Sequence, residues 1–230
     1  MAEFVGISRV VDLIPNGASI MVGGFMGCGS PHKLLRAIAQ KGVSDLTVIC
    51  NDAGMPNGPD GSDYYGVAKL IHNRQVKKLI ATHVGLNPEV AIQLNEGFLD
   101  LTCLPQGSMV EMIRAGGAGL GGILTPTGLG TIVEDAWHVH SVVEVENRKY
   151  LLEKPLKAHF ALISGYKIDK AANIWYKGTT RNFNAVMATA ADVVMAQAEN
   201  LVNVGEIKPE DVVTPGVFVD YVVTGGERDG

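Results

Sequence analysis

Short apolar runs that alternate with helix-like segments most strongly constrain how this chain can fold. Continuous runs occur at Ala18–Val22 and Leu46–Cys50, and the segment between them, His32–Gln40, has a helical period. Later apolar runs and helical patterns follow, at Lys78–Thr82, Pro88–Asn95, Leu99–Leu104, Gly107–Arg114, Phe160–Ile163, Asp192–Ala196 and Val217–Val222. Such apolar strands separated by helices are typical of a parallel sheet that is covered on both faces. The sequence therefore predicts an α/β fold, an open and largely parallel sheet with helices on both faces, as a single domain over residues 1–230.

Charge and composition exclude several classes of function. The chain has 230 residues, a net charge of −5 and no long basic block, so nucleic acid is not expected as a partner. Its first residues, MAEFVGISRVVDLIP, lack the basic and then apolar layout of a signal peptide, and no apolar run is long enough for a membrane helix. We therefore expect a cytoplasmic protein without membrane attachment.

The cysteines and histidines give no metal-binding pattern. The three cysteines are scattered, without a Cys-x-x-Cys pair. His138 and His140 have the spacing that places two side chains on one face of a strand, but no third ligand lies nearby, so we expect both to be exposed. We expect no metal site and no permanently bound cofactor.

A glycine-rich loop follows the first apolar run, in the segment NGASIMVGGFMGCGSP at residues 16–31. Four glycines fall within the seven residues Gly23–Gly29, and Ser30 is a favourable N-cap with Pro31 at the first helical position. A loop between a strand end and a helix N-terminus is a common ligand site, where free N–H groups favour an anion. The loop is predicted to bind a ligand, the alternative being a tight turn without one. Its glycine order fits neither the dinucleotide fingerprint nor a P-loop.

A second glycine-rich segment, LPQGSMVEMIRAGGAGLGGILTPTGLGT at residues 104–131, starts at another strand end. Gln106 there could present its amide N–H to an oxyanion, or could bond nearby backbone. Glu111 and Arg114 have the spacing of a local ion pair, and Arg114–Gly130 is predicted to be a long loop.

Two polar residues, Asn51 and Asp52, directly follow the second predicted strand. They could bind substrate or shape a turn. No nucleophile accompanies these polar positions: there is no Gly-x-Ser-x-Gly motif and no clear Cys–His pair. Glu134 and Asp135 are adjacent, so on a strand they would point to opposite faces.

The two glycine-rich segments resemble the family I coenzyme A-transferases. NGASIMVGGFMGCGSP fits the family signature at every defined position, and residues 104–131 are similar to the second family block. KGTTRNFN (Lys177–Asn184) and VTPGVFVDYVV (Val213–Val223) resemble later landmarks, so the resemblance covers essentially the whole chain. It is greatest to the α subunits of the acetate or acetoacetate enzymes.

This resemblance implies a NagB/RpiA/CoA-transferase-like fold and an enzyme built from α and β subunits, assembled as an α2β2 heterotetramer or larger. It also implies a ping-pong transfer of CoA, as substrate carrier, between acetyl-, butyryl- or acetoacetyl-CoA and a free short-chain carboxylic acid. The nucleophilic glutamate of such enzymes belongs to the β subunit. Glu199, in Ala198–Leu201, lacks the flanking Ser and Gly of that motif and is not expected to be the nucleophile.

The resemblance also assigns expected roles to residues of this chain. The CoA-binding segment would comprise Gly23, Gly24, Phe25, Met26, Gly27, Cys28 and Gly29. Gln106 would stabilise the thioester oxyanion, and Asn51 would lie near the acyl or carboxylate group. Gly116, Gly117 and Gly119, in a glycine-rich lobe, would line the cleft between the subunits.

Two segments depart from the family pattern, Asn57–Leu70 and Ala136–Tyr150, and are expected to be surface loops. Two other functions stay open: a sugar-phosphate isomerase or deaminase on the same fold, and a non-catalytic module that binds acyl-CoA.

Overall fold

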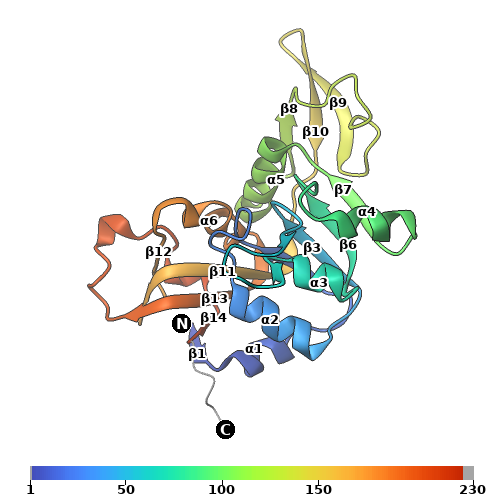
Figure 1. The fold of residues 1–230 in the computed structure, drawn as a ribbon. Helices are drawn as coiled ribbons and strands as arrows, with labels where there is room; N and C mark the ends of the chain where they lie inside the picture. Colours follow the sequence, from blue (N-terminus) through green and yellow to red (C-terminus); the bar gives the residue numbers. More distant parts are fainter. Residues whose placement is uncertain (1, 225–230) are drawn as a thin grey trace.

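The computed structural model describes residues 2–224, and its central element is a nine-stranded sheet. The strand order is β1 (Glu3–Val5), β14 (Tyr221–Val223), β13 (Ala191–Val202), β11 (Ala158–Asp169), β2 (Ser19–Val22), β3 (Leu46–Cys50), β6 (Val76–Ala81) and β7 (Asp100–Cys103). Every pair along this path is parallel, and β12 (Ile174–Trp175) adds antiparallel to β11. The predicted parallel sheet is confirmed (Figure 1).

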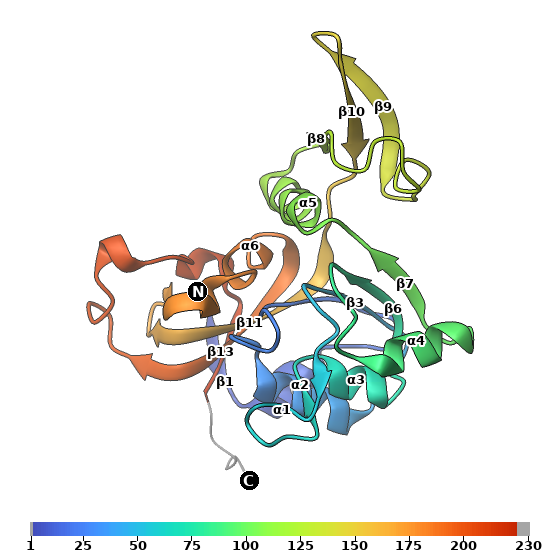
Figure 2. The same ribbon diagram turned by 45° about the horizontal axis from the view of Figure 1, so that its top comes forward.

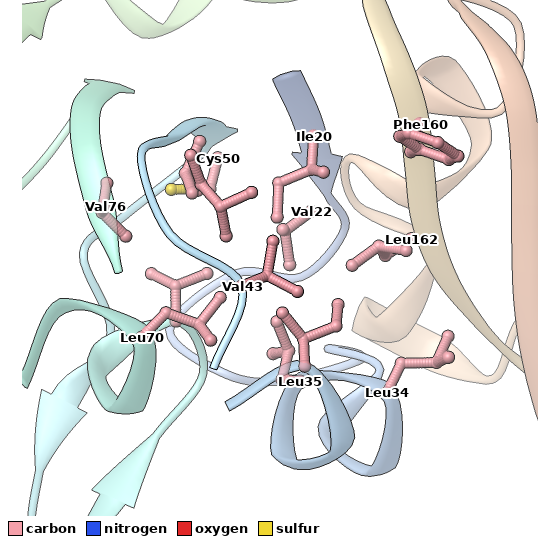
Figure 3. Close-up of a cluster of buried hydrophobic side chains, with 14 of the residues drawn as sticks. Ile20, Val22, Leu34, Leu35, Val43, Cys50, Leu70, Val76, Phe160 and Leu162 are labelled. Carbon is pink, nitrogen blue, oxygen red and sulfur yellow. The ribbon is translucent and has the colours of Figure 1, made fainter. Parts of the chain in front are cut away.

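Helices cover both faces of this sheet, as predicted. One face packs against α1 (Ile7–Asp12), α2 (His32–Lys41), α3 (Ala68–His72) and α4 (Pro88–Asn95), and the other against α5 (Gln106–Ala118) and α6 (Asn184–Met187). Side chains alternate along a strand, so Ile20 and Val22 of β2 enter the first core while Met21 enters the second. Figure 3 shows the first core, where the β2 side chains meet Leu34 and Leu35 of α2.

A three-stranded antiparallel sheet projects from this body beyond α5, in both views (Figures 1 and 2). It contains β8 (Ile123–Thr125), β10 (Arg148–Glu153) and β9 (Val139–Val145), and we call it the arm. A hairpin of β4 (Met55–Pro56) and β5 (Tyr64–Tyr65) and three short 3-10 turns complete the described chain, the turns being Gly178–Arg181, Pro209–Asp211 and Gly216–Phe218. The segments Asn57–Leu70 and Ala136–Tyr150 were therefore wrongly predicted as loops, since both contain strands.

The predicted loop Arg114–Gly130 is also wrong in two places, because α5 continues to Ala118 and ends at the left-handed Gly119, and because β8 occupies Ile123–Thr125. Gly116 explains this extension. A Cβ at Gly116 would lie 2.0 Å from the carbonyl oxygen of Leu156, so only glycine lets the helix pack this closely on the chain leading into β11.

The last predicted strand is shifted toward the C-terminus. Residues Gly216–Phe218, which overlap the start of the predicted Val217–Val222 run, form a 3-10 turn, and β14 begins only at Tyr221. The turn closes through hydrogen bonds from Phe218 N to Pro215 O and from Val219 N to Gly216 O. Pro215 and Gly216 favour a turn here over the β-propensity of the valines that follow.

The N-terminus of α2 is capped by a residue that the sequence did not predict. The helix begins at His32 without a side-chain cap from Ser30 or Pro31. Instead, Gln197 of β13 accepts hydrogen bonds at Oε1 from Lys33 N (2.8 Å) and Leu34 N (3.3 Å). The expected Ser30 cap is therefore wrong, and the N–H groups that would attract an anion are already paired.

Replacing Gln197 by alanine should destabilise the fold by about 1–2 kcal/mol, because two N–H groups at the start of α2 would lose their acceptor. Chemical denaturation of Q197A measures this loss. Gln40→Ala, at an exposed position of the same helix, is the control and should change the free energy of unfolding by less than about 0.5 kcal/mol. Equal stability of the two variants would contradict the capping role.

The base of the arm contains a buried pair of ionisable groups, His138 and Glu153. His138 Nε2 lies 3.8 Å from Glu153 Oε1, and both side chains are almost fully buried. Neither group has a hydrogen-bond partner within the described residues. Burial raises the pKa of Glu153 and lowers the pKa of His138. His138 was thus wrongly expected to be exposed, whereas His140 is exposed as predicted.

The raised pKa of Glu153 predicts a specific pH dependence of stability. Between its ordinary value of 4.5 and its raised pKa, the folded chain keeps a proton that the unfolded chain loses, so stability falls as pH rises through this window. Glu153→Gln removes that dependence. Above pH 4.5, the melting temperature of E153Q should increasingly exceed that of the unchanged protein as the pH rises. A difference that stays constant with pH would contradict the assignment of this pH dependence to Glu153.

Candidate active site

Polar residues from four neighbouring strands meet at one edge of the main sheet. The strands β2, β3, β6 and β7 are parallel, so their carboxyl ends lie together. The loop after β2 is Gly23–Gly29, Asn51 and Asp52 follow β3, Thr82 follows β6, and Gln106 follows β7 at the first position of α5. Ligands of open α/β sheets bind at this edge, where the strand order reverses, which here is between β2 and β11.

Hydrogen bonds connect Gln106 to Asp52 through Asn51. Gln106 Nε2 donates to Asn51 Oδ1 (2.6 Å), and Asn51 Nδ2 donates to Asp52 Oδ2 (2.9 Å). Thr82 Oγ1 also donates to Asn51 Oδ1 (3.1 Å). Asn51 and Asp52 are 2% and 8% exposed, whereas Gln106 is exposed. Gln106 therefore bonds a neighbouring side chain rather than backbone, and its second N–H is left for a ligand.

The tip of the glycine loop is a tight turn fixed by the same carboxylate. Phe25 and Cys28 exchange two backbone hydrogen bonds, 3.1 and 2.9 Å long. The central residues Met26 and Gly27 both have positive φ, 50° and 77°. Met26 N donates to Asp52 Oδ2 (2.6 Å), while Phe25 and Met26 expose their side chains. Asp52 therefore shapes a turn, one of the two alternatives left open for Asn51 and Asp52.

The glycines of this loop are required by contacts within the chain itself. Gly24 has φ of 121°, and a Cβ there would lie 2.0 Å from Ser30 Oγ. At Gly27, a Cβ would lie 1.9 Å from the Tyr65 ring, which stacks on His32 with centroids 4.4 Å apart. Close packing thus explains the glycines without a ligand, and contact between this loop and CoA stays a prediction.

Two asparagines hold the loop on its other side, Asn182 from the turn before α6 and Asn184 at the first position of α6. Asn182 Oδ1 accepts from Gly24 N (3.1 Å), and its Nδ2 donates to Cys28 O (2.9 Å). Asn184 Nδ2 donates to Gly29 O (2.9 Å), and its Oδ1 accepts from Ser164 N (3.0 Å). Both asparagines belong to the segment KGTTRNFN, whose sequence pattern alone predicts no role for them. These contacts could not be predicted from the sequence, because Asn182 lies 158 positions from Gly24 and 154 from Cys28, and only the fold brings them together.

His32 adds a further contact under the loop, since its Nε2 lies 2.9 Å from Gly27 O. Burial lowers the pKa of His32, so the neutral ring, with Nε2 carrying the proton, fits this contact. Burial also raises the pKa of Tyr65, which keeps the stacked phenol protonated. The β4–β5 hairpin therefore packs its Tyr65 side chain against the loop.

A groove of about 560 Å³ runs beside Gln106 between α5 and α6. Its walls are mostly apolar, the polar side chains are those of Gln106, Arg114, Arg181, Asn182 and Thr189, and the other lining residues are Phe25, Val110, Gly117, Ala118, Phe183, Ala185, Val186 and Phe218. None of these described lining residues carries a carboxylate. Arg114 pairs with Glu111 (3.1 Å), as the sequence predicted.

The remaining candidate residues lie at different distances from this groove. Gly117 lines it, but Gly116 is buried within α5 and Gly119 caps the exposed end of the helix. The glycine lobe is therefore not a loop at Gly116 and Gly117, because both are helical. Cys28 Sγ contacts Thr179 Oγ1 at 3.4 Å. Glu199 is exposed on β13 and does not line the groove.

Residues 2–224 also bear on metal binding and on membrane insertion. No group of three or more His, Cys, Asp or Glu side chains in this range is placed to hold a metal ion. In the same part of the chain, every helix is too short or too polar to cross a membrane.

Known proteins resemble this chain in sequence and in fold. Residues 7–225 match the family described as Coenzyme A transferase. The acetoacetyl-CoA:acetate/butyrate CoA transferase alpha subunit of Clostridium acetobutylicum is 46% identical over 96% of this chain and 97% of its own length. The acetate CoA-transferase subunit alpha of Escherichia coli K12 is 42% identical over 92% of each chain. An acyl-CoA transferase of Escherichia coli O157:H7, solved as a thioester complex with CoA, shares the fold with a TM-score of 0.84 at 22% identity, over 99% of this chain and 48% of its own.

The close packing of the glycine loop predicts that a single methyl group added at Gly24 destabilises the protein. Gly24→Ala should destabilise the protein by at least about 1–2 kcal/mol, because φ at this position suits only glycine and the Cβ would collide with Ser30. Gly121→Ala is the control, since its Cβ would enter open space and its φ is not in the left-handed range. Thermal unfolding compares the two variants, and a G24A protein as stable as G121A would show that the loop is not packed in this way.

Proposed function

The chain belongs to the coenzyme A transferase family, and from this premise we propose that it is the α subunit of a short-chain acyl-CoA:carboxylate CoA-transferase. Acetyl-, butyryl- and acetoacetyl-CoA are the proposed donors, and short-chain carboxylic acids are the acceptors. The α-subunit role is supported by relatives of this name that match almost from end to end. Apolar pockets discriminate a single methylene by only about 1–3 kcal/mol, so the groove does not rank these acids.

The observation that carries the proposal is the Gln106 side chain. Its amide is oriented by Asn51, lies at the rim of a mostly apolar groove, and keeps one N–H for a ligand. An N–H donor placed in this way stabilises the oxyanion that forms when a thioester carbonyl is attacked. Acyl transfer between a thioester and a carboxylate passes through such anions repeatedly.

The proposed transfer proceeds through two anhydrides. A glutamate carboxylate attacks the thioester carbon, and CoA leaves as a thiolate to give a mixed anhydride. The thiolate attacks the glutamyl carbonyl, which releases the first acid and leaves a glutamyl-CoA thioester. The acceptor carboxylate then attacks this thioester, and the expelled thiolate attacks the new acyl carbonyl to form the new acyl-CoA and free the glutamate. Gln106 would donate to the carbonyl oxygen in each anionic state.

The nucleophilic glutamate is proposed to come from a β subunit. The described residues that line the groove include no carboxylate. Asp52 is the nearest acid along the hydrogen-bonded chain from Gln106, but it is buried and accepts bonds from Met26 N, Gly54 N and Asn51 Nδ2. A carboxylate held in this way is poorly suited to attack, because its lone pairs are already committed.

We further propose that Gly23–Gly29 contacts CoA, with the exposed Phe25 and Met26 side chains at the turn. Asn51 would lie near the acyl or carboxylate group through its contact with Gln106. A cytoplasmic location, an α2β2 or larger assembly and a single domain over residues 1–230 stay predictions.

The other two functions receive less support. A sugar-phosphate isomerase would use free N–H groups at the start of α2 to hold a phosphate, but Lys33 N and Leu34 N are paired with Gln197. A non-catalytic acyl-CoA-binding module would have no use for an oriented amide beside the groove.

Replacing Gln106 by alanine tests the proposal in the complex of this chain with its β subunit. We expect kcat to fall by about a hundredfold to a thousandfold, because one oxyanion donor contributes about 2.7–4 kcal/mol to the transition state. Affinity for CoA should change little, since the donor acts mainly on the anionic states. Transfer from butyryl-CoA to acetate, followed by the appearance of acetyl-CoA, gives the rate.

Gln40→Ala, on the exposed side of α2, is the matched control and should retain full activity. An active complex whose kcat is insensitive to Q106A would contradict the oxyanion role.

A further inference from the structure

Asp52 is the only group in the hydrogen-bonded series from Gln106 to the loop that, as a carboxylate, accepts without donating. Its Oδ2 accepts from Asn51 Nδ2 (2.9 Å) and from Met26 N (2.6 Å), and its Oδ1 accepts from Gly54 N (3.0 Å). The side chain is 8% exposed and directly follows β3. It therefore links Asn51, the loop after β2 and the turn after β3.

This carboxylate sets the direction of the amides beyond it. Because Asp52 only accepts, Asn51 must turn its Nδ2 toward it, which points Asn51 Oδ1 toward Gln106. Gln106 must then donate from Nε2, which lies 2.6 Å from Asn51 Oδ1, because its own oxygen cannot donate. Without the fixed acceptor, either amide could rotate and present oxygen where a donor is needed.

The same oxygen also holds a strained residue in the loop. Met26 has φ of 50°, a left-handed conformation that is unfavourable for residues other than glycine. Its N–H donates to Asp52 Oδ2 at 2.6 Å, and a hydrogen bond to a charged group is strong enough to offset this strain.

We propose that Asp52 is a positioning residue for CoA transfer, which orients the donor N–H of Gln106 through Asn51 and fixes the loop through Met26. The proposal rests on the oxyanion role of Gln106 proposed above. Asp52 itself touches neither the substrate nor the reacting atoms. It connects Met26 and Gln106, two parts of the site that are 80 positions apart in sequence.

Asp52→Asn tests this role in the complex with the β subunit, because it keeps the shape of the side chain and replaces one acceptor by a donor. We expect kcat to fall by about tenfold to a hundredfold and KM for acyl-CoA to rise, as expected when a hydrogen bond to a charged group is lost. Asp192→Asn, an exposed carboxylate on β13, is the matched control and should leave both values unchanged.

The double variant D52N/Q106A separates positioning from general structural damage. If Asp52 acts on kcat through Gln106, D52N should lower kcat by no more than about twofold in the Q106A background, since coupled residues are not additive. The rise in KM should persist there, because it acts through Met26.

Each result has a distinct meaning. If Q106A lowers kcat, but D52N either leaves kcat unchanged or lowers it equally in both backgrounds, the positioning role of Asp52 is wrong while the oxyanion role of Gln106 stands. If Q106A itself leaves kcat unchanged, the proposed function of Gln106 and the positioning role fail together.

A second variant keeps the test open if D52N does not fold or assemble. Thr82→Val removes the hydroxyl whose single proton is within reach of Asn51 O (2.8 Å) and Oδ1 (3.1 Å), and so removes a donor that helps to orient the Asn51 amide. It should lower kcat by about threefold in the otherwise unchanged protein, as expected for one neutral hydrogen bond, and not in the Q106A background. Equal effects in both backgrounds would contradict the orientation of Gln106 through Asn51.

Discussion

The parallel pairing of β2, β3, β6 and β7 is the constraint on which the rest of the site depends. In-register pairing of Val22 with Cys50 and of Ala81 with Cys103 brings the ends of these strands to one edge. The residues that follow them, from Gly23 to Gln106, can then bond to one another although they are far apart in sequence. The apolar cores on both faces of the sheet keep this edge rigid, because alternate side chains of every central strand are buried.

Hydrogen bonds at this edge then fix the orientation of the polar side chains that follow the strands. Asp52 is fixed by three donors, and Asn182 and Asn184 hold the far side of the loop. The loop is tightly packed through its glycines, and its tip exposes the side chains of Phe25 and Met26, where we propose that it contacts CoA. A loop of this kind is pre-organised, which suits the proposed transfer, in which CoA stays bound through several thioester and anhydride steps.

Periodicity predicted the parallel sheet, the helix at His32 and the ends of β2 and β3, since these follow from local patterns of apolar residues; β11 and β13 extend to Asp169 and Val202, beyond their predicted ends at Ile163 and Ala196. It failed where a distant residue decides a local structure. Gln197 replaces Ser30 as the acceptor at the start of α2, and Gly116 inside α5 permits the close approach of Leu156. His138 looked like an exposed strand residue because its buried partner, Glu153, lies on another strand. The polarity of the Gln106–Asn51–Asp52 contacts likewise depends on tertiary geometry, although each residue could be singled out from its position after a strand.

The most direct test of the central claim is to locate the covalent intermediate. The complex of this chain with its β subunit is incubated with acyl-CoA, quenched, and each chain is weighed by intact mass spectrometry and mapped by peptide analysis. We predict a CoA thioester on a glutamate of the partner chain and an unmodified mass for this chain. A CoA adduct on an acidic residue of this chain would contradict the claim that it supplies the loop and the oxyanion donor while its partner supplies the nucleophile.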